Sequence, residues 1–168
     1  ASANCGIYCG ANIDFVDIDP KTYNISISAL IEKLRKAKKA GKLPKIVVPV
    51  HFGGQPCDMK KIYQLSKKYK FKILEDASHA IGARYEKSKI GSCKYSDITV
   101  FSFHAVKIIT TGEGGMALTK NKKLALKIKR LSGHGITRDK KIMVKRSIHE
   151  IWNYQQIDLG FNYRMTDI

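Results

Sequence analysis

The feature that most constrains the fold of this chain is a regular alternation of short apolar runs with segments of helical periodicity. Three apolar runs and two helical segments follow one another in the order 14–18, 26–40, 45–50, 58–69 and 71–76. Ser26 or Ser28 can cap the first helix and Asp58 the second, because their side chains accept hydrogen bonds from free amides at a helix start. Strands and helices alternating at this spacing imply right-handed crossovers. The sequence therefore predicts an α/β fold with a mostly parallel sheet flanked by helices.

The second half of the chain has a less regular pattern. We expect a short extended piece, an exposed turn, two apolar strands and a helix, at 82–85, 87–95, 98–103, 115–119 and 121–132. Lys107 lies in the loop between the two strands. The segment 133–153 is irregular and charged, which is more typical of a mobile loop than of a core element.

Length and composition indicate a single domain in a reducing compartment. With 168 residues, 43% of them hydrophobic, the chain can bury one core. It contains no apolar run long enough to span a membrane and no signal peptide, so we expect a cytoplasmic protein without membrane contact. Its 4 cysteines are scattered, and the pair Cys5 and Cys9 has no second Cys/His pair at zinc-finger spacing. We therefore predict reduced thiols and no metal site.

The formal net charge of +17 requires a second hypothesis, because a strongly basic domain can bind nucleic acid or another polyanion. The lysines, however, alternate with apolar residues in the two helical segments, as on amphipathic helices with solvated outer faces. No nucleic-acid-binding motif accompanies them. We expect no nucleic-acid partner, although the excess charge can help to attract a nucleotide-sugar diphosphate.

Three residues indicate covalent chemistry. Lys107 follows an apolar strand and precedes a glycine-rich turn, where partial desolvation lowers the pKa of an amine and frees it to form a Schiff base with an aldehyde such as pyridoxal phosphate. Ser102 can offer its hydroxyl to a phosphate. Asp76 ends a short buried strand, and open α/β sheets bind ligands at that end. An acid there suits a pyridinium nitrogen. A single lysine after a strand is more often a solvated surface residue, so the argument depends on the combination.

The combination resembles a known family. Four motifs carry the resemblance in order and spacing, namely Glu75–Gly82, Ser102–Lys107, Thr111–Gly115 and Gly160–Met165. They are similar to those of the DegT/DnrJ/EryC1/StrS nucleotide-sugar aminotransferases, and the resemblance covers the whole chain. It implies part of a fold-type I pyridoxal phosphate-dependent large domain in residues 1–168. A phosphate-binding segment before this chain and a small C-terminal domain after it are expected by the same comparison.

The resemblance also implies roles for individual residues. Lys107 would carry pyridoxal 5'-phosphate and move the proton during transamination, and Asp76 would keep the ring nitrogen protonated. Ser102 would bind the cofactor phosphate, and His79 would lie beside the phenolic oxygen of the ring. Asn162 would reach the cofactor phosphate of a neighbouring subunit, which implies a homodimer with a shared active site.

Two further residues are weaker candidates for substrate binding. His134, in Gly133–Gly135, can line the substrate cleft or simply pack. Arg164 can contact the phosphate or the donor's carboxylate, since arginine suits bidentate recognition of oxyanions. An interface salt bridge explains Arg164 equally well. The turn 112–115 lacks the spacing of a dinucleotide-binding fingerprint, so a Rossmann dehydrogenase is a poor fit.

The resemblance implies a specific reaction. The segments 102–115 and 132–139 are most similar to those of family members in pseudaminic acid biosynthesis. We therefore expect transfer of an amino group from L-glutamate to the 4-keto carbon of a UDP-linked 4-keto-6-deoxy-N-acetylhexosamine. A 4-aminotransferase of the bacillosamine or perosamine type is one alternative, and a non-catalytic polyanion-binding module is another. A family branch in which the lysine is replaced performs dehydration, and Lys107 argues against that reaction.

Overall fold

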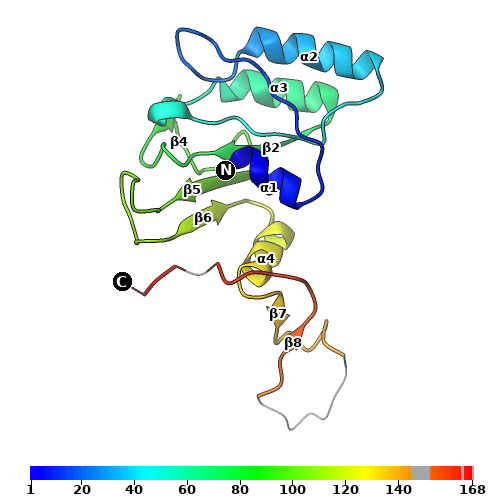
Figure 1. The fold of residues 1–168 in the computed structure, drawn as a ribbon, viewed down its shortest axis with the longest axis vertical. Coiled ribbons are helices and arrows are strands. Elements are labelled where there is room, and N and C mark those ends of the chain that lie inside the picture. Colours follow the sequence, from blue (N-terminus) through cyan, green and yellow to red (C-terminus); the bar gives the residue numbers. More distant parts are fainter. Residues whose placement is uncertain (145–151, 164, 168) are drawn as a thin grey trace.

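The structure is a computed structural model that describes residues 1–144, 152–163 and 165–167. Its main sheet has four strands in the order β1-β2-β5-β6, with bounds Ile46–Val47, Lys72–Asp76, Ile98–Ser102 and Gly115–Leu118. The pairs β1–β2 and β2–β5 are parallel, and β6 runs antiparallel to β5 (Figure 1). The predicted α/β class with a mostly parallel sheet is confirmed.

Two capped helices, α2 (Ile27–Lys39) and α3 (Met59–Tyr69), cover one face of this sheet. Ser26 caps α2 by accepting from the Ala29 amide, and Asp58 caps α3 by accepting from the Lys61 amide. Both helices and β2 contribute to the main core, which consists of Leu30, Leu34, Val47, Cys57, Met59, Ile62, Tyr69, Phe71 and Ile73. The lysines of both helices therefore lie on the solvent side, as their periodicity predicts.

The register of β2 against β5 separates the side chains of the sheet into two faces. Glu75 is aligned with Thr99, and Asp76 is aligned with Val100. Because side chains alternate along a strand, Glu75 and Thr99 share the helix-covered face with the core residue Ile73. Asp76 and Val100 point to the second face, where they are only half-buried. A short helix that the sequence patterns did not predict, α1 (Ser2–Tyr8), begins beside Asp76 on this second face.

The strand predicted at 14–18 is wrong. Only Ile18 pairs there, in an isolated antiparallel bridge with Ile25. Asp14 and Asp17 each accept a hydrogen bond from the amide of the following residue, at 2.9 and 2.8 Å. These side chains occupy backbone donors that a strand ladder would use, so the segment stays irregular despite its alternating pattern.

The strand predicted at 45–50 is shorter than expected. Regular pairing stops after Val47, and a single further parallel bridge joins Val50 to Asp76. Pro49 lies between them and has no amide hydrogen, so it cannot donate to a ladder. Its carbonyl nevertheless accepts the Asp76 amide at 2.9 Å, which keeps this segment beside the end of β2.

The remaining elements surround the sheet. They are the single turn η1 (Phe52–Gly54), the hairpin β3 (Arg84–Tyr85) and β4 (Ser88–Lys89), the helix α4 (Lys122–Leu131), and the antiparallel pair β7 (Ile136–Thr137) and β8 (Gln155–Gln156). The hairpin lies in a region where a short extended piece and a turn were expected. The segment 133–153 was predicted to be a mobile loop, but β7 lies within it and pairs with β8 just beyond its end. Residues 145–151 of this segment lie outside the described residues.

The described part of the chain contains no helix that is long and apolar enough to cross a membrane. Within the same residues no group of three or more potential ligand side chains could hold a metal ion. All four cysteines are free thiols, of which Cys57 and Cys93 are buried. Burial raises the pKa of Cys57 to about 12, so this thiol is inert at neutral pH.

Candidate active site

Asp76 lies at the carboxyl end of β2, between two neighbouring segments that fix its backbone. Its amide donates to the Pro49 carbonyl at 2.9 Å, and the Ala77 amide donates to the Val100 carbonyl at 2.8 Å. The strand end is therefore held from both sides. This is the edge of a parallel sheet at which ligands of open α/β folds bind.

The side chain of Asp76 is half-buried and has a hydrogen-bond donor on each oxygen. The Ser78 amide donates to Oδ1 at 3.1 Å, and the Ser2 hydroxyl donates to Oδ2. Burial alone would raise the pKa of Asp76, but these hydrogen bonds and the charge of His79 outweigh it and hold the pKa below its usual value. Asp76 is therefore a carboxylate at neutral pH, as a partner for a cationic ring nitrogen must be.

Ser102 lies on the next strand and on the same face of the sheet as Asp76. It follows Val100, the register partner of Asp76, by two residues, so side-chain alternation places both polar groups on one side. Ser102 is half-buried, and its Oγ accepts from the His104 amide at 3.4 Å. Its partner across β5–β6 is Gly115, where a Cβ would lie 2.9 Å from the Phe101 carbonyl oxygen. Glycine at that position therefore allows the close approach of the two strands.

Lys107 lies in a loop whose two ends are held together. The Thr111 amide and the Thr110 hydroxyl both donate to the Phe103 carbonyl, each at 3.0 Å. Lys107 itself donates its amide to the His104 carbonyl at 3.0 Å, and its side chain is half-buried. Within the described residues the ammonium group has no hydrogen-bonding or ion-pair partner. The loop therefore places the side-chain amine of Lys107, without a partner among the described residues, just beyond the strand end that carries Ser102.

His79 is held beside Asp76 by an aromatic neighbour. The rings of His79 and Phe52 meet edge to face, with centroids 6.1 Å apart at an interplanar angle of 66°. His79 is half-buried. The structure thus brings Asp76, His79 and Ser102 to the same edge of the sheet, with the Lys107 loop following directly.

The structure brings His134 and Asn162 together at a different place. Asn162 forms an isolated antiparallel bridge with Gly133, and the His134 amide donates to the Phe161 carbonyl at 3.0 Å. Both side chains are exposed, and the bridge lies just after the end of α4, which Figure 1 shows beyond the edge strand β6. Arg164, the third residue predicted there, lies outside the described residues.

The C-terminal segment then returns to the Lys107 loop. The Thr166 hydroxyl donates to the Thr111 carbonyl at 3.1 Å, and Met165 lies against Gly114. Figure 1 shows residues 165–167, drawn in red, below the left end of β6. These residues are therefore part of the surroundings of the candidate site.

Sequence patterns missed two contributors to this site, Ser2 and Phe52. Ser2 binds a carboxylate 74 residues further along the chain, and a single serine before an unpredicted helix gives no local signal of such a contact. Phe52 lies between the strand predicted at 45–50 and the helix predicted at 58–69, where an aromatic residue beside two glycines could have suggested a close backbone approach.

Comparison with known proteins places the fold of this chain in a known class. The structure superimposes with a TM-score of 0.79 on PseC of Helicobacter pylori, an aminotransferase involved in the biosynthesis of pseudoaminic acid, at 29% identity over 97% of this chain and 39% of that one. With the PLP-form of the putative sugar aminotransferase Spr1654 from Streptococcus pneumoniae, the TM-score is 0.78 at 28% identity, over 99% of this chain and 43% of that one. The fold is that of part of an aminotransferase of this class.

Sequence relatives agree with the structural neighbours. The chain is 42% identical to protein MJ1066 of Methanocaldococcus jannaschii, over 100% of this chain and 41% of that protein. It is 39% identical to UDP-4-amino-4,6-dideoxy-N-acetyl-beta-L-altrosamine transaminase of Campylobacter jejuni and to GDP-perosamine synthase of Caulobacter vibrioides, over 100% of this chain and 40% of each relative. The chain thus spans well under half of the length of these relatives.

The family itself follows from a match over the whole chain. The model of the DegT/DnrJ/EryC1/StrS aminotransferase family matches residues 1–168. The chain belongs to this family.

Proposed function

We propose that the full-length protein is a pyridoxal phosphate-dependent nucleotide-sugar aminotransferase in which Lys107 binds the cofactor covalently. The observation that carries the proposal is the grouping of three residues at one sheet edge: the ionised carboxylate of Asp76, Ser102 on the same face, and Lys107 on the following loop. The amine of Lys107 has no partner among the residues that the structure describes. The grouping lies in a chain that matches an aminotransferase family throughout.

The described residues fit the cofactor by their chemistry. When bound, pyridoxal phosphate supplies an electron sink that stabilises negative charge on the carbon losing its proton. Asp76, with its lowered pKa, would keep the proton on the ring nitrogen, and Ser102 would donate to the phosphate. His79 would lie beside the ring oxygen. Lys107 would hold the cofactor covalently and would also act as the general acid and base that moves the proton.

We further propose L-glutamate as the amino donor and a UDP-linked 4-keto-6-deoxy-N-acetylhexosamine of pseudaminic acid biosynthesis as the acceptor. The altrosamine transaminase and PseC support this substrate. GDP-perosamine synthase has the same sequence identity to this chain, 39%, as the altrosamine transaminase. A 4-aminotransferase of the perosamine or bacillosamine type is therefore the alternative. In both cases the amino group is transferred to the 4-keto carbon of a nucleotide sugar.

The proposal includes a cytoplasmic homodimer with a shared site. The place of the exposed Asn162 beside Gly133, after the end of α4, supports a role toward a second subunit. Arg164 is proposed to contact the phosphate or the donor's carboxylate. Exposed apolar side chains on the Lys107 loop and the C-terminal segment support a covering partner; examples are Val106 at 78% exposure and Tyr163 at 73%. The four free thiols are consistent with a reducing compartment.

The test is a spectrum followed by an assay of the full-length protein. A lysine-bound cofactor should give an absorbance band near about 410–430 nm that borohydride bleaches. Incubation with L-glutamate should then convert a UDP-4-ketosugar to its 4-amino product. A matched panel of UDP- and GDP-linked 4-ketosugars decides between the alternatives, and a colourless protein inactive on every member would overturn the proposed function.

One observation favours the polyanion-binding alternative. A groove of about 500 Å³ lies at the amino ends of β2 and β5, opposite the candidate site, and is lined in part by Lys67, Lys70, Lys72, Lys94 and Lys120. Lys72 is paired there with Asp97 at 3.0 Å. Salt-sensitive affinity for DNA in a colourless protein would favour this alternative.

A further inference from the structure

Two buried polar side chains form a pair directly behind Asp76, on the helix-covered face of the sheet. His51 is 0% exposed and Glu75 is 3% exposed, and His51 Nε2 lies 2.9 Å from Glu75 Oε2. The Cys57 amide donates to His51 Nδ1 at 3.2 Å, so Nδ1 is the acceptor and Nε2 carries the proton donated to Glu75. Thr99 donates its hydroxyl to the other Glu75 oxygen at 3.2 Å. The His51–Glu75 pair is therefore fully hydrogen-bonded.

The pair joins the same two segments as the backbone bridge at Asp76. The His51 amide donates to the Asp76 carbonyl at 3.0 Å, and the Asp76 amide donates to the Pro49 carbonyl at 2.9 Å. His51 thus contacts β2 twice, through its backbone at Asp76 and through its ring at Glu75. Glu75, which makes the buried contact, directly precedes Asp76, which carries the carboxylate at the candidate site.

The loop that begins at His51 also supports His79. The Phe52 ring contacts the His79 ring, and Gly54, with φ of +83°, approaches so closely that a Cβ there would lie 2.9 Å from the His79 carbonyl oxygen. Asn24, which is 5% exposed, fixes this loop from the other side. Its Oδ1 accepts from the Phe52 amide at 3.0 Å, and its Nδ2 donates to the Gln55 carbonyl at 2.9 Å.

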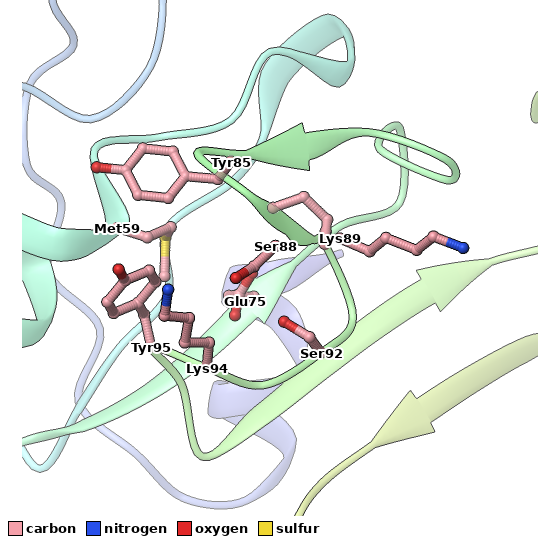
Figure 2. Close-up of a pocket in the computed structure, with 9 residues that line it drawn as sticks. Met59, Glu75, Tyr85, Ser88, Lys89, Ser92, Lys94 and Tyr95 are labelled. Carbon is pink, nitrogen blue, oxygen red and sulfur yellow. The ribbon is translucent and has the colours of Figure 1, made fainter.

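Water has little access to Glu75 beyond these partners. Figure 2 shows Glu75 within a small pocket whose other lining residues include Met59, Tyr85, Ser88, Ser92, Lys94 and Tyr95. The pocket encloses about 10 Å³, which is space for one water at most. A Glu75 carboxylate that lost His51 would therefore remain poorly hydrated. Replacing both partners of a buried hydrogen bond by well-packed apolar residues is often nearly neutral for stability, so stability alone does not explain the His51–Glu75 pair.

We propose that His51 and Glu75 are positioning residues that hold Asp76 and His79 in place for the cofactor ring. This inference rests on the proposed function. The bond between His51 Nε2 and Glu75 fixes the strand end that carries Asp76, and the loop continuing from His51 fixes His79. Neither residue of the pair touches the cofactor.

Three variants of the full-length protein separate the two bonds of His51. His51→Leu removes both hydrogen bonds of the ring, the one to Glu75 and the one from the Cys57 amide. His51→Gln places an amide donor near the position of Nε2 and preserves the bond to Glu75, whereas His51→Asn places its polar atoms near Nδ1 and preserves only the bond to the Cys57 amide. The proposal expects the dissociation constant for pyridoxal phosphate to rise about tenfold or more in His51→Leu, since the partners left behind are buried and unpaired. The dissociation constant of His51→Asn should rise as much as that of His51→Leu, whereas that of His51→Gln should stay near the wild-type value.

Two further measurements distinguish positioning from general support of the fold. In a double-mutant cycle, His51→Leu should have little further effect on cofactor affinity in a background that carries both Asp76→Asn and His79→Ala, because the pair acts through Asp76 and His79. Amide hydrogen exchange of the cofactor-free protein should accelerate in residues 72–79 in the variants His51→Leu and His51→Asn, but not in His51→Gln.

Three results would each overturn the proposal: additive losses of affinity in the cycle, equal cofactor affinities for His51→Gln and His51→Asn, or unchanged hydrogen exchange in residues 72–79. If wild-type protein binds no pyridoxal phosphate the proposed function fails, and exchange alone then decides whether the pair holds Asp76. If His51→Leu does not fold, the comparison of Gln with Asn decides.

Discussion

Asp76 keeps its negative charge because hydrogen bonds outweigh its partial burial. Burial raises the pKa of this carboxyl, whereas the Ser2 hydroxyl, the Ser78 amide and the charge of His79 lower it, with a net lowering. A lowered pKa in the folded state means that Asp76 contributes stability above the pKa of its unfolded form. That contribution is lost as the pH falls through the folded pKa.

We predict that Asp76→Asn leaves cofactor binding measurable but lowers kcat by about 100-fold or more, since the ring nitrogen loses the charge that stabilises its protonated form. The measurement is steady-state turnover at saturating cofactor. Ser2→Ala is the matched control, because it removes one hydrogen bond but leaves the carboxylate, and its loss should be much smaller. Turnover of Asp76→Asn near the wild-type rate would show that Asp76 has another role.

Some site residues were predictable from the sequence and others were not. Asp76 and Ser102 could be found because each ends an apolar strand, and parallel strands bring such ends to one edge. Ser2 and His51 could not, since their partners Asp76 and Glu75 lie 74 and 24 residues away. Their contacts depend on tertiary packing, which a local pattern does not record.

Among the helices, α3 depends on a cap with two functions. Asp58 accepts from the Lys61 amide at the start of α3, and it also accepts the Tyr85 hydroxyl at 2.7 Å. Burial and this bond raise the pKa of Tyr85 to about 12. For Asp58 itself, burial is outweighed by hydrogen bonds from Lys61 and Tyr85, and the pKa is lowered. The cap therefore ties α3 to the β3–β4 hairpin.

We predict that Asp58→Ala lowers the free energy of unfolding by about 1 kcal/mol or somewhat more, through loss of the cap and of the Tyr85 partner. Because the pKa of Asp58 is lowered on folding, the difference from wild type should be present near neutral pH and shrink as the pH falls through the folded pKa. Denaturant unfolding at several pH values measures this. Asp58→Asn keeps an acceptor oxygen, so at neutral pH it should lose less; an equal loss in both variants would rule out the cap as the cause.

The capped helices and the buried strands were predictable from the sequence, whereas the short strand pairings were not. Ser26 and Asp58 mark their helices because a side-chain cap is a local interaction. The segment 14–18 has a strand pattern but lacks a partner ladder, and β7 and β8 exist only because distant segments meet. Pairing between segments decides these cases.

For the whole molecule, the proposed shared site predicts complementation between subunits. Lys107→Ala and Asn162→Ala should each be impaired alone. Mixing them should restore part of the activity, because one site of each mixed dimer then has both wild-type residues. Tagged protomers confirm that subunits exchange. Verified mixed dimers without recovery, when Asn162→Ala alone is impaired, would exclude the shared site.

The covalent attachment of the cofactor to Lys107 is the central claim, and peptide mapping tests it most directly. The full-length protein is incubated with pyridoxal phosphate, reduced with borohydride, digested and analysed by mass spectrometry. We predict the reduced cofactor on the peptide that contains Lys107, and its absence from the Lys107→Ala variant. Attachment to a different lysine, or an active wild-type enzyme without any modified lysine, would contradict the account.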